Sequence, residues 1–341
     1  MDDRNAQVGW TEAQWNRVRE EVLQAWQRVR VAGSFLPVYG PLPPSTQVVP
    51  TEVLDADDGT VDDRATAALI EIALPVKLSR QQIWEEDLSS ALLQFRRRAT
   101  QLGQLEDWFI FNGTYPSIEL PPKPPADLAK EYRPEFDHLS ARALGSWVPT
   151  SGTPTPIVGV DQSLQLAGMR ERNPGSLGLI EGPRVKQNPA KTALGNNGLM
   201  NAIIDAINSL EKHGYVAPYV CVLGRNSFKA AFTPIRNSTV LPRDQIEPII
   251  GRELLHASGI DILPHRSNLY YLNGEQWQSR GVLLSIADEP IDLALAAEAT
   301  PEFRQVDLEG RYVFSVFERF ALRIKDAKAI VPLRFEKPKK P

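Results

Sequence analysis

Proline divides this chain of 341 residues into two blocks that can carry regular structure. Twelve of the 28 prolines lie between Tyr115 and Pro189. Proline removes a backbone donor and disrupts the interior of helices and central strands, so few ordinary elements survive at that density. We therefore interpret residues 115–190 as a Pro-rich insertion of extended segments and turns, and we expect the core to form from the residues on either side.

The composition is that of a folded protein with nearly balanced charge. The chain carries 38 Lys and Arg against 42 Asp and Glu, and 42% of its residues are hydrophobic, which suffices for one large or two modest domains. The balanced charge argues against nucleic-acid binding. The first residues lack a secretory signal pattern, and no stretch approaches the roughly 18 apolar residues of a membrane span. We expect a cytoplasmic protein with no nucleic acid and no membrane among its partners.

The sequence predicts an amphipathic helix near the N-terminus. Thr11 and Gln14 have the spacing of a capping box, in which two side chains satisfy the first free backbone N–H groups of a helix. An apolar stripe at helical spacing follows, made of Trp15, Val18, Val22, Trp26 and Val29. Two interpretations stay open: the stripe docks on the chain's own core, or part of it also receives a partner.

Residues 33–63 predict an extended arm and a loop, because glycine and proline interrupt any helical pattern and five aspartates follow. These aspartates do not match a calcium loop, since the required Gly and Glu positions, counted from Asp55, both hold threonine. Apolar and polar residues then alternate over residues 68–76, which indicates a strand. Pro75 places that strand at a sheet edge or a bulge.

A second capping box, Ser79 with Gln82, predicts the start of one long helix that runs to about Phe111. Its apolar stripe comprises Leu88, Leu92, Phe95, Ala99, Leu102, Leu105 and Phe109. Three consecutive arginines at positions 96–98 point in different directions on a helix. We therefore expect them on a solvated face or in a salt bridge between subunits, and not in a phosphate site.

The second block predicts alternating helices and strands, followed by strands alone. The expected helices cover residues 199–210, 226–232 and 246–257. The expected strands cover residues 220–223, 259–263, 282–286, 291–296, 312–324 and 329–335. Together with the first block, this order indicates the α+β fold class.

The sequence contains no arrangement of residues that indicates catalysis or metal binding. No two of the four histidines have the i, i+4 spacing that presents a pair of imidazoles to zinc. The single Cys221 lies in an apolar run, where a thiol acts as a small hydrophobic group. The adjacent carboxylates Glu106 and Asp107 are expected to diverge on a helix and not to converge on one substrate atom. We predict no catalytic residue, no metal site and no enzymatic activity.

Four separated stretches resemble the family 1 encapsulins, the shell proteins of prokaryotic nanocompartments. They are Thr11-Glu12-Ala13-Gln14-Trp15 with the later turn Gly40-Pro41; Leu78 through Glu106-Asp107-Trp108-Phe109-Ile110-Phe111-Asn112-Gly113; His213-Gly214-Tyr215-Val216-Ala217-Pro218-Tyr219; and Glu318 through Leu333-Arg334-Phe335. The order of predicted elements is also similar to the Hong Kong 97 phage-type capsid fold, which has a peripheral domain, an axial domain and an extended loop.

The resemblance implies a self-assembling icosahedral shell whose subunit is structural. Such a shell encloses a cargo enzyme, often a dye-decolorising peroxidase or a ferritin-like protein, which is captured through a short targeting peptide. In the family, the N-terminal helix lies on the inner surface and helps to form the groove for this peptide. Carried over to this sequence, that role falls on Trp15, Val18, Val22 and Trp26. The tryptophan that binds flavin in some shells aligns near Gln81, with Trp84 only a displaced candidate, so we predict no cofactor.

The resemblance also suggests a division of the chain. We expect an inner N-terminal helix, an arm with a peripheral domain, the insertion, an axial domain, C-terminal strands returning to the peripheral domain and a flexible tail, over residues 1–32, 33–114, 115–190, 191–285, 286–336 and 337–341 respectively. Two alternatives to an encapsulin-like shell stay open. One is a phage or prophage major capsid protein of the same fold, and the other is a soluble α+β enzyme with an unrecognised site.

Overall fold

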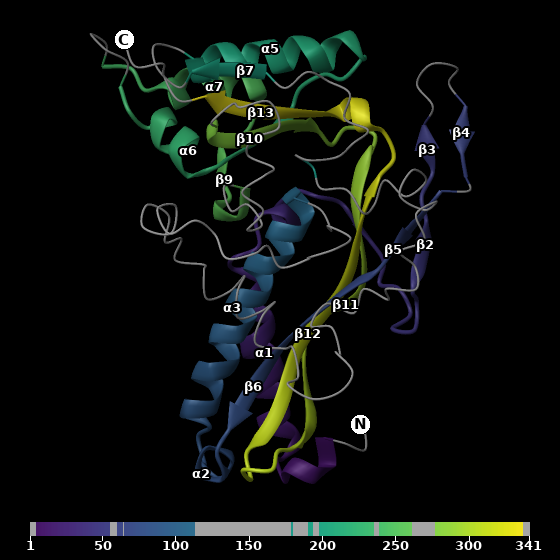
Figure 1. Ribbon diagram of the computed structural model, residues 1–341, viewed down its shortest axis with the longest axis vertical. Helices are drawn as coiled ribbons and strands as arrows, with labels where there is room; N and C mark the ends of the chain where they lie inside the picture. The colour runs from purple at the N-terminus through teal and green to yellow at the C-terminus, as the bar shows by residue number, and fades with distance from the viewer. Residues whose placement is uncertain are drawn as a thin grey trace, which may run out of the picture.

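The computed structural model describes residues 5–54, 60–63, 65–112, 179, 190–193, 198–234, 239–260 and 277–336. Figure 1 shows an elongated α+β molecule, with a long sheet and helices at one end and a second sheet flanked by helices at the other. The expected tail, almost all of the expected Pro-rich insertion and the middle of the acidic stretch lie outside the described residues.

The long end is built on a four-stranded sheet in the order β1-β11-β12-β6. Its strands are β1 (Val38–Tyr39), β6 (Ile70–Leu78), β11 (Ile291–Val306) and β12 (Tyr312–Ile324). Among the described strands, β6 pairs only with β12, and Pro75 lies opposite Ser315 in that ladder. The edge position tolerates the missing N–H of proline, so the expected edge strand is confirmed, two residues further along the chain.

Two helices cover one face of this sheet: α1 (Glu12–Gln27) and α3 (Ser89–Asn112). The capping box of α1 is confirmed, because the Gln14 N–H donates to Thr11 Oγ1 at 3.3 Å and the Thr11 N–H donates to Gln14 Oε1 at 2.9 Å. The prediction of one long second helix was wrong. The capping box at Ser79 opens a separate short helix, α2 (Arg80–Ile83), and Leu88, at φ 54°, interrupts the helical path before α3.

The other end holds a five-stranded sheet in the order β7-β13-β10-β8-β9. Its strands are β7 (Ala190–Ala193), β8 (Tyr219–Leu223), β9 (Leu255–His256), β10 (Trp277–Ser285) and β13 (Ile330–Glu336). Helices α5 (Gly198–Lys212), α6 (Arg225–Ala231) and α7 (Pro242–Ile250) pack around it. The final strand therefore differs from the expected division, because β13 pairs with β10 and does not return to the long sheet.

Two local predictions in this second half were also wrong. The expected helix over residues 246–257 is displaced: α7 begins with Pro242 at its first position and ends where Gly251 adopts φ 73°. The expected strand over 259–263 is replaced, in its described part, by the 3₁₀ helix Ser258–Ile260. The remaining described 3₁₀ turns are Asn5–Val8, Ala32–Ser34 and Ala327–Ala329.

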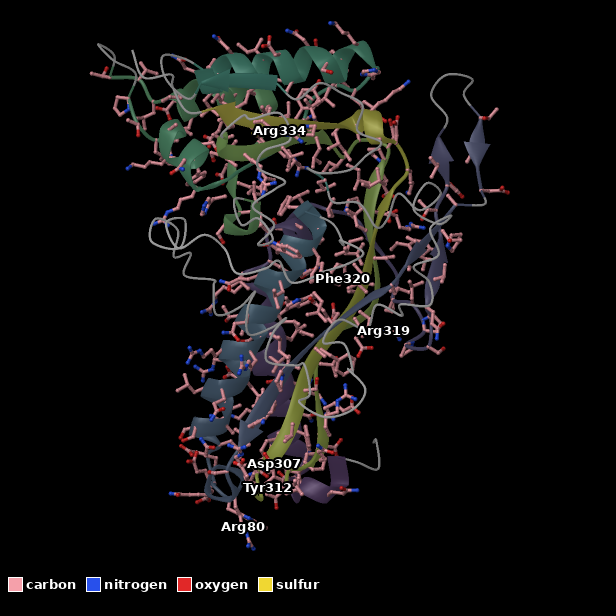
Figure 2. All side chains as sticks on the ribbon, viewed as in Figure 1. Arg80, Asp307, Tyr312, Arg319, Phe320 and Arg334 are labelled. Atoms are coloured by element: carbon pink, nitrogen blue, oxygen red, sulfur yellow. The ribbon has the colours of Figure 1, made fainter. Side chains whose placement is uncertain are left out.

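The expected arm projects beside the long sheet as two small hairpins (Figure 1). They pair β2 (Val48–Pro50) with β5 (Thr66–Ala68), and β3 (Val53–Leu54) with β4 (Val61–Asp62). Arg319 and Phe320, neighbours on β12, lie on opposite sides of that strand (Figure 2). Arg319 Nη2 donates to the Thr46 carbonyl at 2.8 Å and so ties the start of the arm to the sheet.

The core of the long end is centred on four aromatic rings. Trp10 stacks on Phe314 with ring centroids 5.1 Å apart, and Trp15 meets Trp10 edge-on at 5.0 Å. Phe95 of α3 contacts Phe314 at 5.4 Å. The Trp10 indole N–H donates to the Ile83 carbonyl at 3.0 Å, which satisfies its polar atom inside the core. This cluster joins the N-terminal segment, α3 and β12 into one packed unit.

Helices α1 and α3 run parallel and pack closely at Gly103. A Cβ at this position would lie 2.8 Å from Val29 Cγ2 and 3.1 Å from the Trp26 carbonyl oxygen. Contacts under about 3.0 Å essentially never occur for real Cβ atoms, so Val29 would have to shift, and the Trp26 carbonyl of α1 would have to move by a few tenths of an ångström. Glycine is required here for packing and not for its backbone freedom.

We predict that Gly103→Ala destabilises the protein, although alanine favours helices. The gain in helix propensity, about 1 kcal/mol, is opposed by overpacking against α1, which costs roughly 1–3 kcal/mol. The melting temperature in calorimetry should fall. A variant that melts higher than the wild type would show that α1 is not held this close to α3.

Candidate functional site

The four residues carried over from the resemblance, Trp15, Val18, Val22 and Trp26, are completely buried within the chain. They face α3 and the long sheet, as the contact between Trp15 and Phe314 illustrates. The expectation that part of this stripe forms an exposed slot therefore does not hold for the described conformation. Burying four large apolar side chains stabilises the fold, and the first interpretation, docking on the chain's own core, describes the stripe.

The exposed surface above the buried stripe is a seam between the two parallel helices. At its start, Arg17 Nη1 donates to the Asp87 carbonyl at 3.1 Å, and further along Arg96 Nε pairs with Glu21 Oε2 at 2.8 Å. Helical spacing extends these two contacts into two facing rows. We call the set the α1–α3 seam, and it comprises Arg17, Glu21 and Gln24 from α1, Arg28 at its C-cap, and Leu93, Arg96, Thr100 and Gln104 from α3.

Leu93 is the apolar residue of this seam and is 65% exposed. The other members are polar, and three arginines against one glutamate leave an excess of positive charge. The expectation for the three arginines at 96–98 is thus modified, because Arg96 pairs within its own chain and Arg98 donates to Gln101 at 2.8 Å.

A buried ion pair lies at the far end of the same two helices. Arg30, just after α1, places Nη2 2.6 Å from Glu106 Oε1, and both side chains are almost fully buried. The guanidinium also lies over the Trp26 ring, 3.9 Å from its centroid. Burial raises the pKa of Glu106 to about 7, while the charge and hydrogen bond of Arg30 act in the opposite direction.

Asp107 caps the turn that follows α1. Its carboxylate accepts the Val31 N–H at 2.8 Å and the Ala32 N–H at 2.8 Å. Burial raises the pKa of Asp107 to about 7, opposed by these two backbone donors. The side chain therefore fixes the direction in which the chain leaves α1.

Glu318 of β12 is a third buried carboxyl group at this point. Its side chain is fully buried, and neither of its oxygens has a hydrogen-bond partner. Burial raises the pKa of Glu318 well above its usual value, and the neighbouring charge of Glu106 raises it further. We call Arg30, Glu106, Asp107 and Glu318 the buried carboxyl cluster.

The sequence did not predict this cluster. Glu106 and Asp107 were expected to diverge, yet both contact the turn over residues 30–32. The turn lies alongside α3, so Arg30 can reach Glu106 while the Ala32 N–H reaches Asp107. One signal was available. Glu318 lies on the inward face of β12, the same face as the buried Phe314, Val316 and Phe320. The alternation of the strand predicts an apolar residue at this position.

The remaining candidate residues have simple roles. Cys221 is buried in β8, and burial raises the pKa of its thiol to about 12, which fits the predicted place in the core. Trp84 follows α2 and is largely exposed. Within the described ranges, no three His, Cys, Asp or Glu side chains are grouped so that they could hold a metal ion. None of the helices that the structure describes is long and apolar enough to span a membrane.

Comparison with known proteins gives a consistent picture. A family model described as "encapsulating protein for peroxidase" matches residues 4–118 and 172–263, more than half of the chain. A search of curated proteins finds no match. The virus-like particle from Pyrococcus furiosus has a similar structure, with a TM-score of 0.54 at 11% identity, over 95% of this chain and 100% of that chain. The capsid of an empty GTA particle has a TM-score of 0.50 at 14% identity, over 90% of each chain. The Hong Kong 97 phage-type capsid fold is thereby confirmed.

We predict that Arg30→Met strongly destabilises the protein, because it leaves Glu106 buried without its cation. Breaking a buried pair in this way costs about 3–5 kcal/mol. The loss should be smaller at pH 5.5 than at pH 8.5, because Glu106 can take up a proton at the lower pH. Arg28→Met, at an exposed position on the preceding turn, serves as the control in urea denaturation. Equal effects of the two changes would contradict a stabilising role for the pair.

Proposed function

This chain belongs to the family of encapsulating proteins for peroxidase, and we propose that its copies close into an icosahedral shell around a peroxidase as cargo. The observation that carries this proposal is the family match over more than half of the chain. The fold supports it, because a particle-forming protein shares it over nearly the full length of both chains. The subunit then contributes a wall, and the chemistry belongs to the enclosed enzyme.

The arm offers a physical means of assembly. Each of its two hairpins has only two strands, so every strand keeps one edge without a partner in the described part of the chain. Val48 and Val61 on these strands are exposed. Unpaired edges with exposed apolar residues gain stability by pairing with another chain. In this proposal the arm of one subunit packs on its neighbour, and the arm residues that are exposed in a single chain become buried in the shell.

The cargo contact is proposed for the α1–α3 seam. Trp15, Val18, Val22 and Trp26 would support this surface from beneath, since their side chains hold α1 against the core. An apolar residue of the targeting peptide would cover Leu93. The excess of arginine over glutamate along the seam favours a peptide that also carries a carboxylate.

A phage-type capsid protein is the second candidate, and the capsid fold shared with the empty GTA particle favours it. The two candidates differ in what the particle encloses: a capsid packages nucleic acid, and an encapsulating protein holds an enzyme. The family match argues against the third hypothesis, that the chain is a soluble enzyme.

We predict that the purified protein forms uniform hollow particles in negative-stain microscopy, and that nuclease treatment leaves no protected nucleic acid inside them. Particles with protected DNA would favour the capsid candidate. Protein that stays monomeric or dimeric at micromolar concentration would contradict both hypotheses, the encapsulating shell and the phage-type capsid.

We predict that Leu93→Asp leaves assembly intact and lowers cargo loading at least tenfold, which corresponds to a loss of about 1.4 kcal/mol. The added carboxylate removes the apolar contact and introduces a charge that repels an acidic peptide. Loading is measured as the cargo-to-shell ratio after co-expression with a dye-decolorising peroxidase that carries a C-terminal targeting peptide. Leu308→Asp, an equally drastic change at the exposed turn between β11 and β12, is the control. Unchanged loading in Leu93→Asp would remove the seam assignment.

A further inference from the structure

The buried carboxyl cluster contains more carboxyl groups than positively charged groups. Three carboxyl groups, those of Glu106, Asp107 and Glu318, are all buried, and one guanidinium, that of Arg30, lies among them. Placing two uncompensated negative charges in a buried site is costly. A folded chain avoids this cost when the site takes up protons.

The hydrogen bonds identify the carboxyl group that takes the proton. Glu106 pairs with the Arg30 guanidinium, and Asp107 accepts hydrogen bonds from two backbone N–H groups. Glu318 receives no donor, and the Trp26 indole N–H, which faces the cluster, makes no hydrogen bond of normal geometry. Glu106 Oε2 also lacks a donor. A protonated Glu318 could donate to such an oxygen, whereas an ionised Glu318 would add a third negative charge.

We propose that Glu318 is an uncharged acid that latches helix α1 to α3 and β12, and that its ionisation in alkaline solution releases this latch. Among the described residues, the charged groups that act on it belong to the cluster: Arg30 from the segment after α1, and Glu106 and Asp107 from α3. On the sheet, its ladder partner on β6 is the apolar Ile72. The inference concerns the stability of the subunit and does not depend on what a shell encloses.

The direction of the pH effect follows from linkage. Burial raises the pKa of Glu318 above its value in the unfolded chain, so at pH values between the two the folded state keeps a proton that the unfolded state has lost. The stability gained from the neutral acid is complete at acidic pH and is lost as the pH rises through the folded-state pKa. The raised pKa values of Glu106 and Asp107 act in the same direction.

Release of the latch should affect α1 before the rest of the fold. The turn over residues 30–32 is held on α3 by two contacts: Arg30 donates to Glu106, and the Val31 and Ala32 N–H groups donate to Asp107. A new charge at Glu318 repels both carboxylates and weakens the attachment of this turn. The C-terminal end of α1 then opens, and the bonds after Arg28 and Arg30 become accessible to trypsin.

Glu318→Gln tests the proposal, because an amide has the shape of the neutral acid and cannot ionise. Between pH 6 and pH 9 the melting temperature of the wild type should fall, and at pH 9 Glu318→Gln should melt higher than the wild type by about 3 °C or more. A short trypsin pulse at pH 9 should cut the wild type after Arg28 and Arg30 at least threefold faster than the variant. Cleavage at Arg252, which is exposed just after α7, corrects for the activity of trypsin.

Glu298→Gln, a change of an exposed carboxyl group on β11, is the matched control and should follow the wild type. Glu318→Leu provides a second neutral side chain at the same core position. If Glu318→Gln retains the full pH dependence of the wild type, or melts lower than the wild type at pH 9, Glu318 is not a neutral latch. Failure of both neutral variants to fold would equally overturn the proposal, since it would show that the charge is needed.

Discussion

The burial of the α1 stripe against α3 and β12 is the contact on which the rest of the structure depends. Trp15 lies in the aromatic cluster with Phe314 and Trp10, and Gly103 lets the two helices approach. Because α1 is fixed here, the turn after it reaches α3, and the chain can continue to β1 and the arm. The same burial removes the stripe from any partner and leaves the α1–α3 seam as the exposed surface of these helices.

A polar layer closes the end of this apolar contact. Arg30, Glu106 and Asp107 position the turn after α1 through directional bonds, which apolar packing alone does not supply. Such a layer contributes little net stability, because desolvation offsets most of the attraction between the charges. It does specify one geometry for the joint between helix and sheet, and it makes that joint sensitive to protonation.

Sequence patterns predicted most elements of the long end, because their signals are local. Thr11 and Gln14 are three residues apart, and the period of α3 runs over several turns. The errors arose where tertiary contacts decide: β13 joins the second sheet through pairing with β10, and the buried stripe became a core because α3 and β12 cover it. The cluster at Glu318 brings together residues more than 200 positions apart, so no spacing rule could find it.

In the proposed shell, the strand edges of the arm that lack a partner in the described part of the chain are buried against neighbouring copies. The most direct test is the mass of the purified particle, measured by sedimentation velocity at micromolar concentration. A shell subunit should give a single sharp species in the megadalton range, many times the 38.0 kDa of one chain. A population of monomers and dimers under the same conditions would contradict the assignment as a shell subunit.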